Sequence, residues 1–134
     1  MIGVLLVTHG AIGETLLASA AQILNGRPEQ ADALGVSRIE DPELVLSRAR
    51  TRVARLDTGS GVLILTDIFG ATPCNVVAKL LVDGRVEGVA GVSLPMLLRV
   101  LQSRNGSLAA VVERALSGGA EGVVHVNRDA CRNA

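Results

Sequence analysis

The stretch GVLILTDIFGATP, residues 61–73, carries the signals that decide the fold. It begins with a run of apolar and β-branched side chains up to Thr66, which is typical of a strand buried on both faces of a parallel sheet. Asp67 ends that run, and a short loop then leads to Thr72 and Pro73, a pair typical of the start of a helix. A buried strand followed directly by a helix is the repeating unit of parallel α/β folds.

The same alternation continues on both sides of this stretch. Further strands are predicted at residues 2–7, 31–36 and 86–92. Helical patterns lie between them, and glycine or proline marks most of their ends. The predicted helices are residues 12–24, a helix opened by Asp41 and Pro42, and residues 72–82, 94–102 and 107–116, the last closed by Gly118 and Gly119.

Strands that alternate with helices predict an α/β fold, here a doubly wound three-layer sandwich around a mainly parallel sheet of four strands. A last apolar stretch, residues 121–126, follows two helices and is predicted to be a further strand. It can join the sheet as an edge strand, or leave the subunit and pair with a partner. We expect one domain over residues 1–126 and a polar tail over residues 127–134.

The composition of the 134 residues argues against several classes of function. Hydrophobic residues make up 49%, which is enough for a sizeable core in one domain. The 13 basic and 13 acidic residues cancel, so neither nucleic acid nor an anionic membrane surface is the expected partner. One phenylalanine, with no tyrosine or tryptophan, leaves little for stacking on bases or flavin rings.

The cysteines and the apolar runs indicate where the protein works. Cys74 and Cys131 are far apart and show neither disulfide nor metal-binding spacing, which fits a reducing compartment. Residues 1–7 are apolar, but they are too few for a signal peptide and lack its basic residues. No apolar run reaches the roughly 18 residues of a membrane helix. We therefore expect a cytoplasmic protein.

Two polar side chains close the strands expected at the centre of the sheet. His9 follows the first strand and Asp67 the third. In a doubly wound sheet these strands are neighbours, and ligands bind beyond their carboxyl ends, where the winding reverses. A neutral imidazole is a nucleophile through its unprotonated nitrogen, and a carboxylate bonded to the other nitrogen fixes the tautomer and stabilises the charge that develops on attack. The pair therefore predicts a nucleophile, with phosphorus as a candidate target.

The loop after Asp67 supplies groups that suit a phosphoryl group. It leads into a helix N-terminus, where free backbone N–H groups and the positive end of the helix dipole attract anions. Gly70 lets the backbone approach closely, and Thr72 can either cap the helix or donate its hydroxyl to phosphate. A second turn of small residues follows His9 and begins with Gly10.

These residues also have structural interpretations. His9 could be an exposed or structural histidine, Asp67 a turn former, and Thr72 only a helix start. His125, in the predicted last strand, is interpreted as a packing residue, and Cys74 as a structural one. A receiver domain would need an acidic pair after the first strand, and a flavodoxin would need a Ser/Thr-rich phosphate loop with aromatic clamps. A metal site would need more ligands than His9 and Asp67 provide.

Three segments together are specific for a known family. Residues 4–10 read VLLVTHG, residues 61–75 read GVLILTDIFGATPCN, and residues 88–97 read GVAGVSLPML. In this order, over about residues 1–126, they resemble the start, the second signature and the "GVNLPML" signature of mannose-family enzyme IIA (EIIA) domains of the bacterial phosphotransferase system. The phosphoprotein subunit of dihydroxyacetone kinase shares the fold and the histidine, but the DIFGATP segment favours the mannose branch.

The resemblance implies a role for each site residue. His9 matches the phosphoacceptor histidine, Asp67 the aspartate that hydrogen-bonds its ring, and Thr72 a serine or threonine near the phosphoryl group. The residues expected to bind the phosphoryl group are Gly10, Gly70, Ala71 and Thr72. No metal and no organic cofactor are expected for the transfer.

The resemblance also implies partners. The phosphoryl group is expected to come from phospho-HPr and to pass to an EIIB component for sugar uptake, with a membrane involved only through a permease. A homodimer that exchanges the last strand is expected. The alternative is a stand-alone regulatory phosphoprotein, whose partners depend on the phosphorylation of His9.

The sequence departs from the family pattern in three places. Ala71 stands where some relatives have a second glycine, and Ser93 stands where asparagine is common before Leu-Pro. The chain ends soon after the IIA region, so EIIB is expected to be a separate chain. None of these departures removes the pair of His9 and Asp67.

Overall fold

The computed structural model describes residues 1–128, and residues 129–134, with Cys131 among them, lie outside the described part. Four strands alternate with helices in it. The strands are β1 (Gly3–His9), β2 (Ala31–Val36), β3 (Val62–Thr66) and β4 (Val86–Ala90). The helices are α1 (Ile12–Leu24), α2 (Pro42–Leu56), α3 (Thr72–Ala78), α4 (Leu94–Leu101) and α5 (Leu108–Glu121), and a 3₁₀ turn, η1 (Val126–Arg128), follows.

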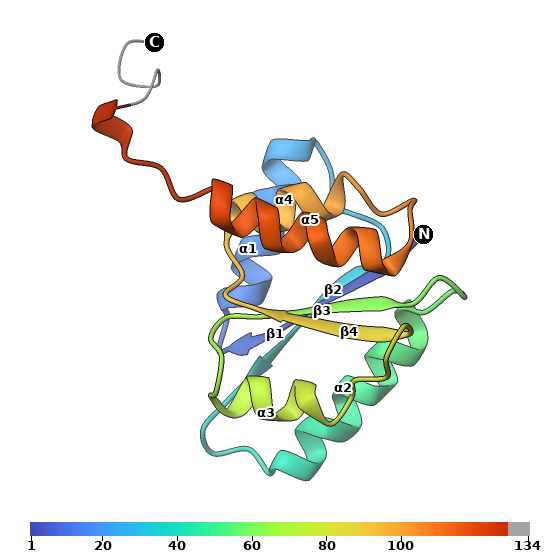
Figure 1. The fold of residues 1–134 in the computed structure, drawn as a ribbon. Coiled ribbons are helices and arrows are strands. Elements are labelled where there is room, and N and C mark those ends of the chain that lie inside the picture. The colour runs from blue at the N-terminus through green and yellow to red at the C-terminus, as the bar shows by residue number, and fades with distance from the viewer. Residues whose placement is uncertain (129–134) are drawn as a thin grey trace.

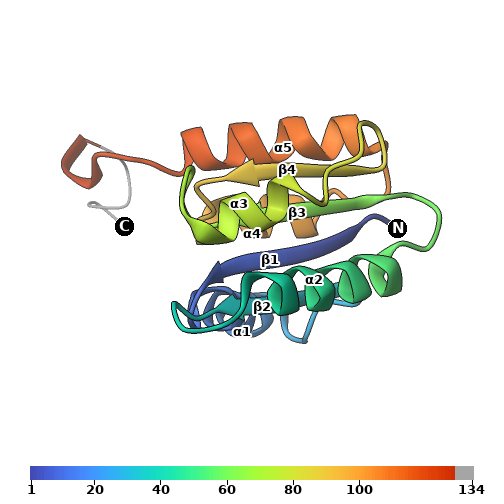
Figure 2. The same ribbon diagram turned by 90° about the horizontal axis from the view of Figure 1, so that it is seen from below.

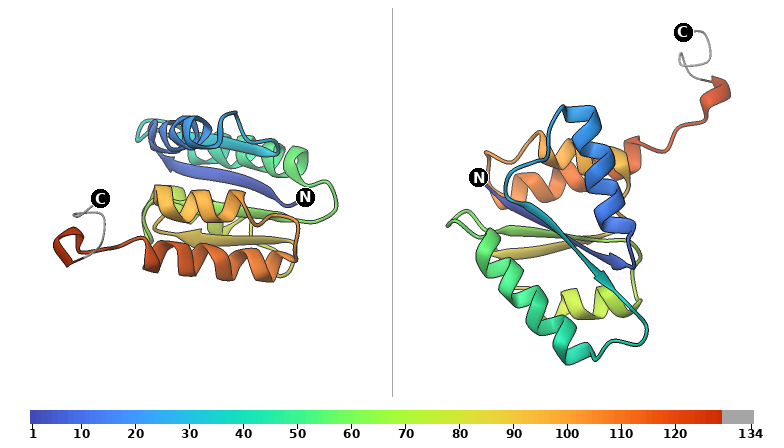
Figure 3. Two further views of the ribbon diagram at one scale, coloured as in Figure 1. Left: turned by 90° about the horizontal axis from the view of Figure 1, so that it is seen from above. Right: turned by 180° about the vertical axis from the view of Figure 1, so that it is seen from behind.

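The sheet confirms the predicted fold class. All four strands are parallel and lie in the order β2-β1-β3-β4, so β1 and β3 are neighbours at the centre. Helices α1, α4 and α5 cover one face of the sheet, and α2 and α3 cover the other (Figure 1). The view from behind shows the same three layers, and the view from above looks down on helices that lie over the sheet (Figure 3).

Alternate residues of the central strands belong to two separate cores. Val4 and Leu6 of β1 pack with side chains of α1, α4 and α5, whereas Leu5 and Val7 pack with those of α2 and α3. All four side chains are completely buried. Because helices cover both faces, these strands are apolar up to their carboxyl ends instead of alternating with polar residues.

Capping side chains fix the starts of α2 and α5. Asp41 accepts a hydrogen bond of 3.0 Å from the N–H of Glu43 at the start of α2, and Pro42 is the first helical residue. Ser107 accepts one of 3.1 Å from the N–H of Ala110 in α5. These bonds satisfy N–H groups that have no partner within the helix. None of the helices in residues 1–128 is both long and apolar enough to cross a membrane.

The prediction that Gly118 and Gly119 end the last helix is wrong, because α5 continues to Glu121. These glycines face α4 instead of ending α5. A Cβ atom at Gly118 would lie 3.1 Å from the Cβ of Arg99 and 3.3 Å from the Cα of Met96. Gly118 therefore allows α4 and α5 to pack closely, since the distance between two helices depends on the side chains at their contact.

The predicted extent of α3, residues 72–82, is also wrong, because the helix ends at Ala78. A turn at Gly84, whose φ is +79°, brings Val82 and Val86 together as an antiparallel bridge. The N–H of Val82 donates to the carbonyl of Val86 at 3.0 Å, and the reverse bond is 2.8 Å long. This pairing directs the chain into β4 and leaves no room for another helical turn.

The strand predicted at residues 121–126 is not present in the described sheet. Glu121 ends α5, and residues 122–128, the C-terminal arm, leave the body at the end toward which β1 and β4 point (Figure 2). The arm does not run along β4, so an edge strand in the chain's own sheet is excluded for these residues. Pairing with a second subunit stays a prediction. Of the predicted tail, Asn127 and Arg128 belong to η1.

Candidate functional site

His9 and Asp67 lie side by side at the carboxyl edge of the sheet, as the strand order predicts. The Nδ1 of His9 is 2.8 Å from the Oδ2 of Asp67, and the backbone N–H of His9 donates to the same oxygen at 3.1 Å. The Asp67 side chain is 12% exposed, whereas the His9 side chain is 45% exposed. A largely buried carboxylate is therefore hydrogen-bonded to an imidazole ring that is exposed to solvent.

The protonation of Asp67 sets the tautomer of the His9 ring. Burial raises the pKa of the Asp67 carboxyl, but hydrogen bonds from the ring and from the N–H of His9 lower it by more, so the pKa lies below its ordinary value. An ionised carboxylate only accepts hydrogen bonds, so Nδ1 carries the proton that it donates. The neutral ring then keeps a free electron pair on Nε2, which has no hydrogen-bond partner within residues 1–128. This arrangement can act as a nucleophile.

The other oxygen of Asp67 is held by its own loop. Oδ1 accepts a bond of 3.2 Å from the N–H of Ile68 and one of 3.4 Å from the hydroxyl of Thr66. With two donors from His9 on Oδ2, the carboxylate cannot rotate without breaking hydrogen bonds. A buried, fully bonded carboxylate of this kind is preorganised to stabilise positive charge on the ring.

Thr8 is a site residue that the sequence reasoning missed. Its side chain is completely buried, and its Oγ1 accepts a bond of 2.8 Å from the N–H of Gly13 in the first turn of α1. Ala11, at the N-cap position of α1, makes no side-chain cap, so Thr8 caps the helix from the strand before it. The sequence signal for this role is a hydroxyl within an otherwise apolar strand, because a buried polar group needs a hydrogen-bond partner.

The predicted phosphoryl-binding residues lie in the two turns that follow β1 and β3. Gly10, with φ of +47°, comes directly after His9, while Gly70 and Ala71 lie between Asp67 and α3. The N-cap of α3 is Ala71 and not Thr72, so capping is not the role of the Thr72 hydroxyl. That side chain is exposed and makes no hydrogen bond within the described residues.

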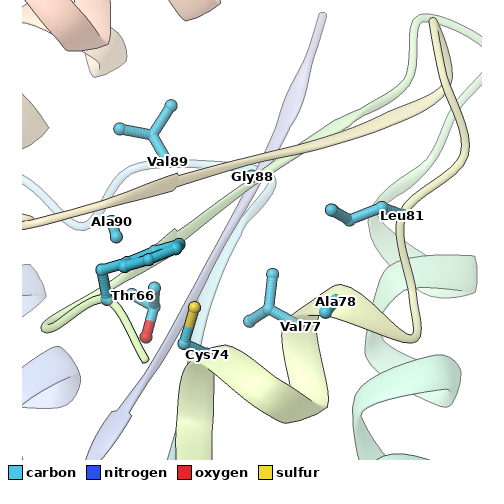
Figure 4. A pocket seen from close by; sticks show the side chains of 9 residues that line it. Thr66, Cys74, Val77, Ala78, Leu81, Gly88, Val89 and Ala90 are labelled. Carbon is cyan, nitrogen blue, oxygen red and sulfur yellow. The ribbon is translucent and has the colours of Figure 1, made fainter. Parts of the chain in front are cut away.

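Two cavities flank this edge of the molecule without containing the histidine pair. One of about 160 Å³ is apolar, and Figure 4 shows Cys74 and Val77 of α3 facing Gly88 and Ala90 of β4 across it. The other, of about 260 Å³, lies between α2 and α3 and includes Thr72 in its wall. His9 therefore stands on an open surface, where a ring can reach a group carried by another macromolecule.

No group of three or more His, Cys, Asp or Glu side chains gathers within residues 1–128 as a metal site would require. Cys74 is half-buried, lies at the cavity wall and has no disulfide partner in that part of the chain. His125 is exposed on the C-terminal arm. The prediction that His125 is a packing residue is therefore wrong for the single chain, because the strand that would have buried it does not form.

Comparison with known proteins identifies relatives that match most of the chain. The family model EIIA-man, described as "PTS system fructose IIA component", matches residues 3–116. The "PTS system mannose-specific EIIAB component" of Escherichia coli (strain K12) is 34% identical over 125 residues, which is 91% of this chain and 38% of that protein. The "PTS system fructose-specific EIIA component" of Bacillus subtilis (strain 168) is 32% identical over 105 residues, 78% of this chain and 71% of that one.

Solved structures share the fold. The crystal structure of "phosphotransferase system component EIIA" from Streptococcus agalactiae superposes with a TM-score of 0.85 at 24% sequence identity, over 96% of this chain and all of that one. The chain spans well under half the length of the Escherichia coli relative.

Proposed function

We propose that His9 takes a phosphoryl group from phospho-HPr and passes it to an EIIB domain, because this chain belongs to the EIIA-man family of the phosphotransferase system (PTS). Family membership makes the chain a component of the sugar phosphotransferase system. The observation that carries the finer proposal is the 2.8 Å contact between Nδ1 of His9 and Oδ2 of Asp67, which leaves Nε2 free on an open surface. We take residues 1–126 as the EIIA domain, working in the cytoplasm.

The transfer is a substitution at phosphorus. The electron pair of His9 Nε2 attacks the phosphorus, and the N–P bond forms as the bond to the donor breaks, with its electron pair staying on the donor. The ring becomes positively charged while Nδ1–H still donates to Asp67, so the carboxylate offsets the new charge. Transfer to EIIB is the same step with His9 as the leaving group. Neither step requires a metal or an organic cofactor.

The turns around the pair support binding of the phosphoryl oxygens. The first N–H groups of α3 have no partner within the helix, and the helix dipole is positive at that end. The exposed Thr72 hydroxyl has no hydrogen bond within residues 1–128 and can donate to an oxygen. Gly10, Gly70 and Ala71 carry at most a methyl group, so the backbone can approach the phosphate closely.

The C-terminal arm supports a homodimer. Val123, Val124 and Val126 are 86%, 52% and 56% exposed, and the outer edge of β4 pairs with no strand in residues 1–128. Exposed apolar side chains and an open sheet edge both favour pairing with another chain. We propose that the arm of one subunit pairs with the other subunit.

The test measures acid-labile phosphate after incubation with phosphoenolpyruvate, enzyme I and HPr. We expect stoichiometric uptake by the wild type, none by His9→Ala, and normal uptake by His125→Ala, which removes the other histidine as a matched control. Uptake by His9→Ala would refute the assignment. Phosphate that enters at His9 but passes to no EIIB domain would favour the regulatory alternative.

A further inference from the structure

The turn that carries His9 rests on the neighbouring edge strand. His9 pairs with Val36 in the register of β1 and β2, and the N–H of Gly10 donates to the carbonyl of Val36 at 3.1 Å. Gly35 comes just before Val36, and a Cβ atom there would lie 2.3 Å from the carbonyl oxygen of Gly10. Real Cβ atoms essentially never come within 3.0 Å of a heavy atom that lies outside their own and the adjacent residues. The turn therefore occupies a position that only glycine at residue 35 allows.

The same turn is fixed on its other side by the carboxylate of the site. Oδ2 of Asp67 accepts both the backbone N–H of His9, at 3.1 Å, and its ring Nδ1, at 2.8 Å. Main chain and ring thus share one oxygen. A displacement of the turn changes both contacts and redirects Nε2.

A third contact holds the turn from the inside of the domain. The hydroxyl of Thr8 donates to the carbonyl of His9 at 3.3 Å and accepts from the N–H of Gly13 at 2.8 Å. It therefore connects the residue that carries the imidazole to the first turn of α1. This bond is buried, so its loss would leave the N–H of Gly13 without a partner.

We propose that Gly35 and Thr8 are positioning residues for phosphoryl transfer at His9. Gly35 provides the space in which the turn lies, and Thr8 ties that turn to α1. Neither residue touches the phosphoryl group, and both act through the angle of the imidazole against Asp67. The rate readout rests on the proposed function, whereas the geometry of the ring can be tested without it.

The sheet offers a matched control at its opposite end. A Cβ atom at Gly3, the first residue of β1, would lie 2.6 Å from the carbonyl oxygen of Leu56. Gly3→Ala therefore forces a side chain against a backbone carbonyl in the same sheet, as Gly35→Ala does, but at the far end of the strand that carries His9.

The experiment compares Gly35→Ala with Gly3→Ala in the full chain by three measurements. These are the rate of phosphoryl uptake from phospho-HPr, the midpoint of urea unfolding, and the ¹⁵N shifts of the unphosphorylated imidazole of His9. We expect both variants to unfold at lower urea. Only Gly35→Ala should slow uptake, by about 10- to 100-fold, and change the ring shifts, because a misplacement of about 1 Å can cost 10²-fold in rate. Equal rates and unchanged ring shifts would overturn the proposal.

A second pair decides the matter if Gly35→Ala does not fold. Thr8→Val removes the hydroxyl at nearly constant shape, and Thr8→Ser restores it. Slow uptake and altered ring shifts in Thr8→Val, with recovery in Thr8→Ser, support the proposal, and wild-type behaviour of Thr8→Val overturns it. If the wild type takes up no phosphate, the proposed function fails, and the ring shifts alone then test the positioning.

Discussion

At the scale of single residues, the proposed chemistry depends on one hydrogen bond. Asp67 accepts from Nδ1 of His9 and thereby leaves the nucleophilic electron pair on Nε2. Asp67→Asn keeps the shape of the side chain but removes its charge, and its amide can donate to the ring and favour the wrong tautomer. We expect phosphoryl uptake to slow by about 10²- to 10³-fold in a variant that still folds.

Uptake kinetics of Asp67→Asn with phospho-HPr, together with the ¹⁵N shifts of the ring, check this expectation. His9→Ala serves as the blank for uptake. A variant that takes up phosphate at the wild-type rate would remove Asp67 from the mechanism, because the remaining amide carries no charge to offset the phosphorylated ring.

Asp67 also makes stability depend on pH in the acid range. Burial raises the pKa of its carboxyl, but the hydrogen bonds that it accepts, chiefly from His9, and the charge of His9 together lower it by more, so the pKa in the folded chain lies below the ordinary value of 3.8. Its contribution is therefore complete above about pH 3.8 and is lost as the pH falls through the lower, folded pKa. We expect the difference in unfolding free energy between the wild type and Asp67→Asn to shrink over that interval. Urea unfolding at a series of acid pH values measures it, and a constant difference would contradict the expectation.

At the scale of elements, two neighbouring glycines differ in their contacts where α5 packs against α4. A Cβ atom at Gly118 would press on the Cβ of Arg99 and the Cα of Met96, whereas at Gly119 the nearest atom is the flexible end of Met96 at 2.8 Å. Alanine has a helix propensity about 1 kcal/mol better than that of glycine. We therefore expect Gly119→Ala to be neutral or stabilising by up to about 1 kcal/mol, and Gly118→Ala to be destabilising by about 1 kcal/mol or more.

Urea unfolding of the two alanine variants side by side tests whether their stabilities differ in this way. Each variant is the control of the other, since both lie in the last turns of α5. Equal stabilities would show that the close approach of the two helices does not require the glycine at position 118.

The elements show which local signals were sufficient in the sequence. The bounds of α1 and β2 are as predicted. In α1 the local signals were sufficient, because an apolar stripe marks the helix and Asn25, in the left-handed conformation after Leu24, ends it. The predicted ends of α3 and α5 are wrong because the observed ends depend on contacts that the helical patterns do not reveal. The pairing of Val82 with Val86 and the packing of Gly118 on α4 leave no periodic pattern in the sequence.

The importance of Gly35 was only partly predictable from the sequence. A glycine inside a strand is a known sign that another backbone approaches closely, so the residue type alone pointed to a contact there. Its partner, the carbonyl of Gly10, becomes visible only when β1 and β2 are placed in register. The pairing of His9 with Asp67, in contrast, followed from strand order alone, since both residues end central strands.

At the scale of the whole molecule, the proposed dimer depends on the C-terminal arm, residues 122–128. A single chain gives the valines of residues 122–128 no strand to pair with, and the proposed dimer supplies one. We expect the full chain to sediment as a dimer and a chain that ends at Glu121 to sediment as a folded monomer, because α5 is complete at that residue. A full chain that stays monomeric at micromolar concentration, or a truncated chain that stays dimeric, would contradict the exchange.

The central claim is that Nε2 of His9 accepts the phosphoryl group while Nδ1 remains bonded to Asp67. The most direct measurement is the phosphorus–nitrogen coupling in the NMR spectrum of the chain labelled with ¹⁵N-histidine and phosphorylated through enzyme I and HPr. We expect coupling to Nε2 of His9, a retained Nδ1 proton, and no coupling to His125. Phosphate on Nδ1 of His9, on His125 or on no histidine would contradict the account.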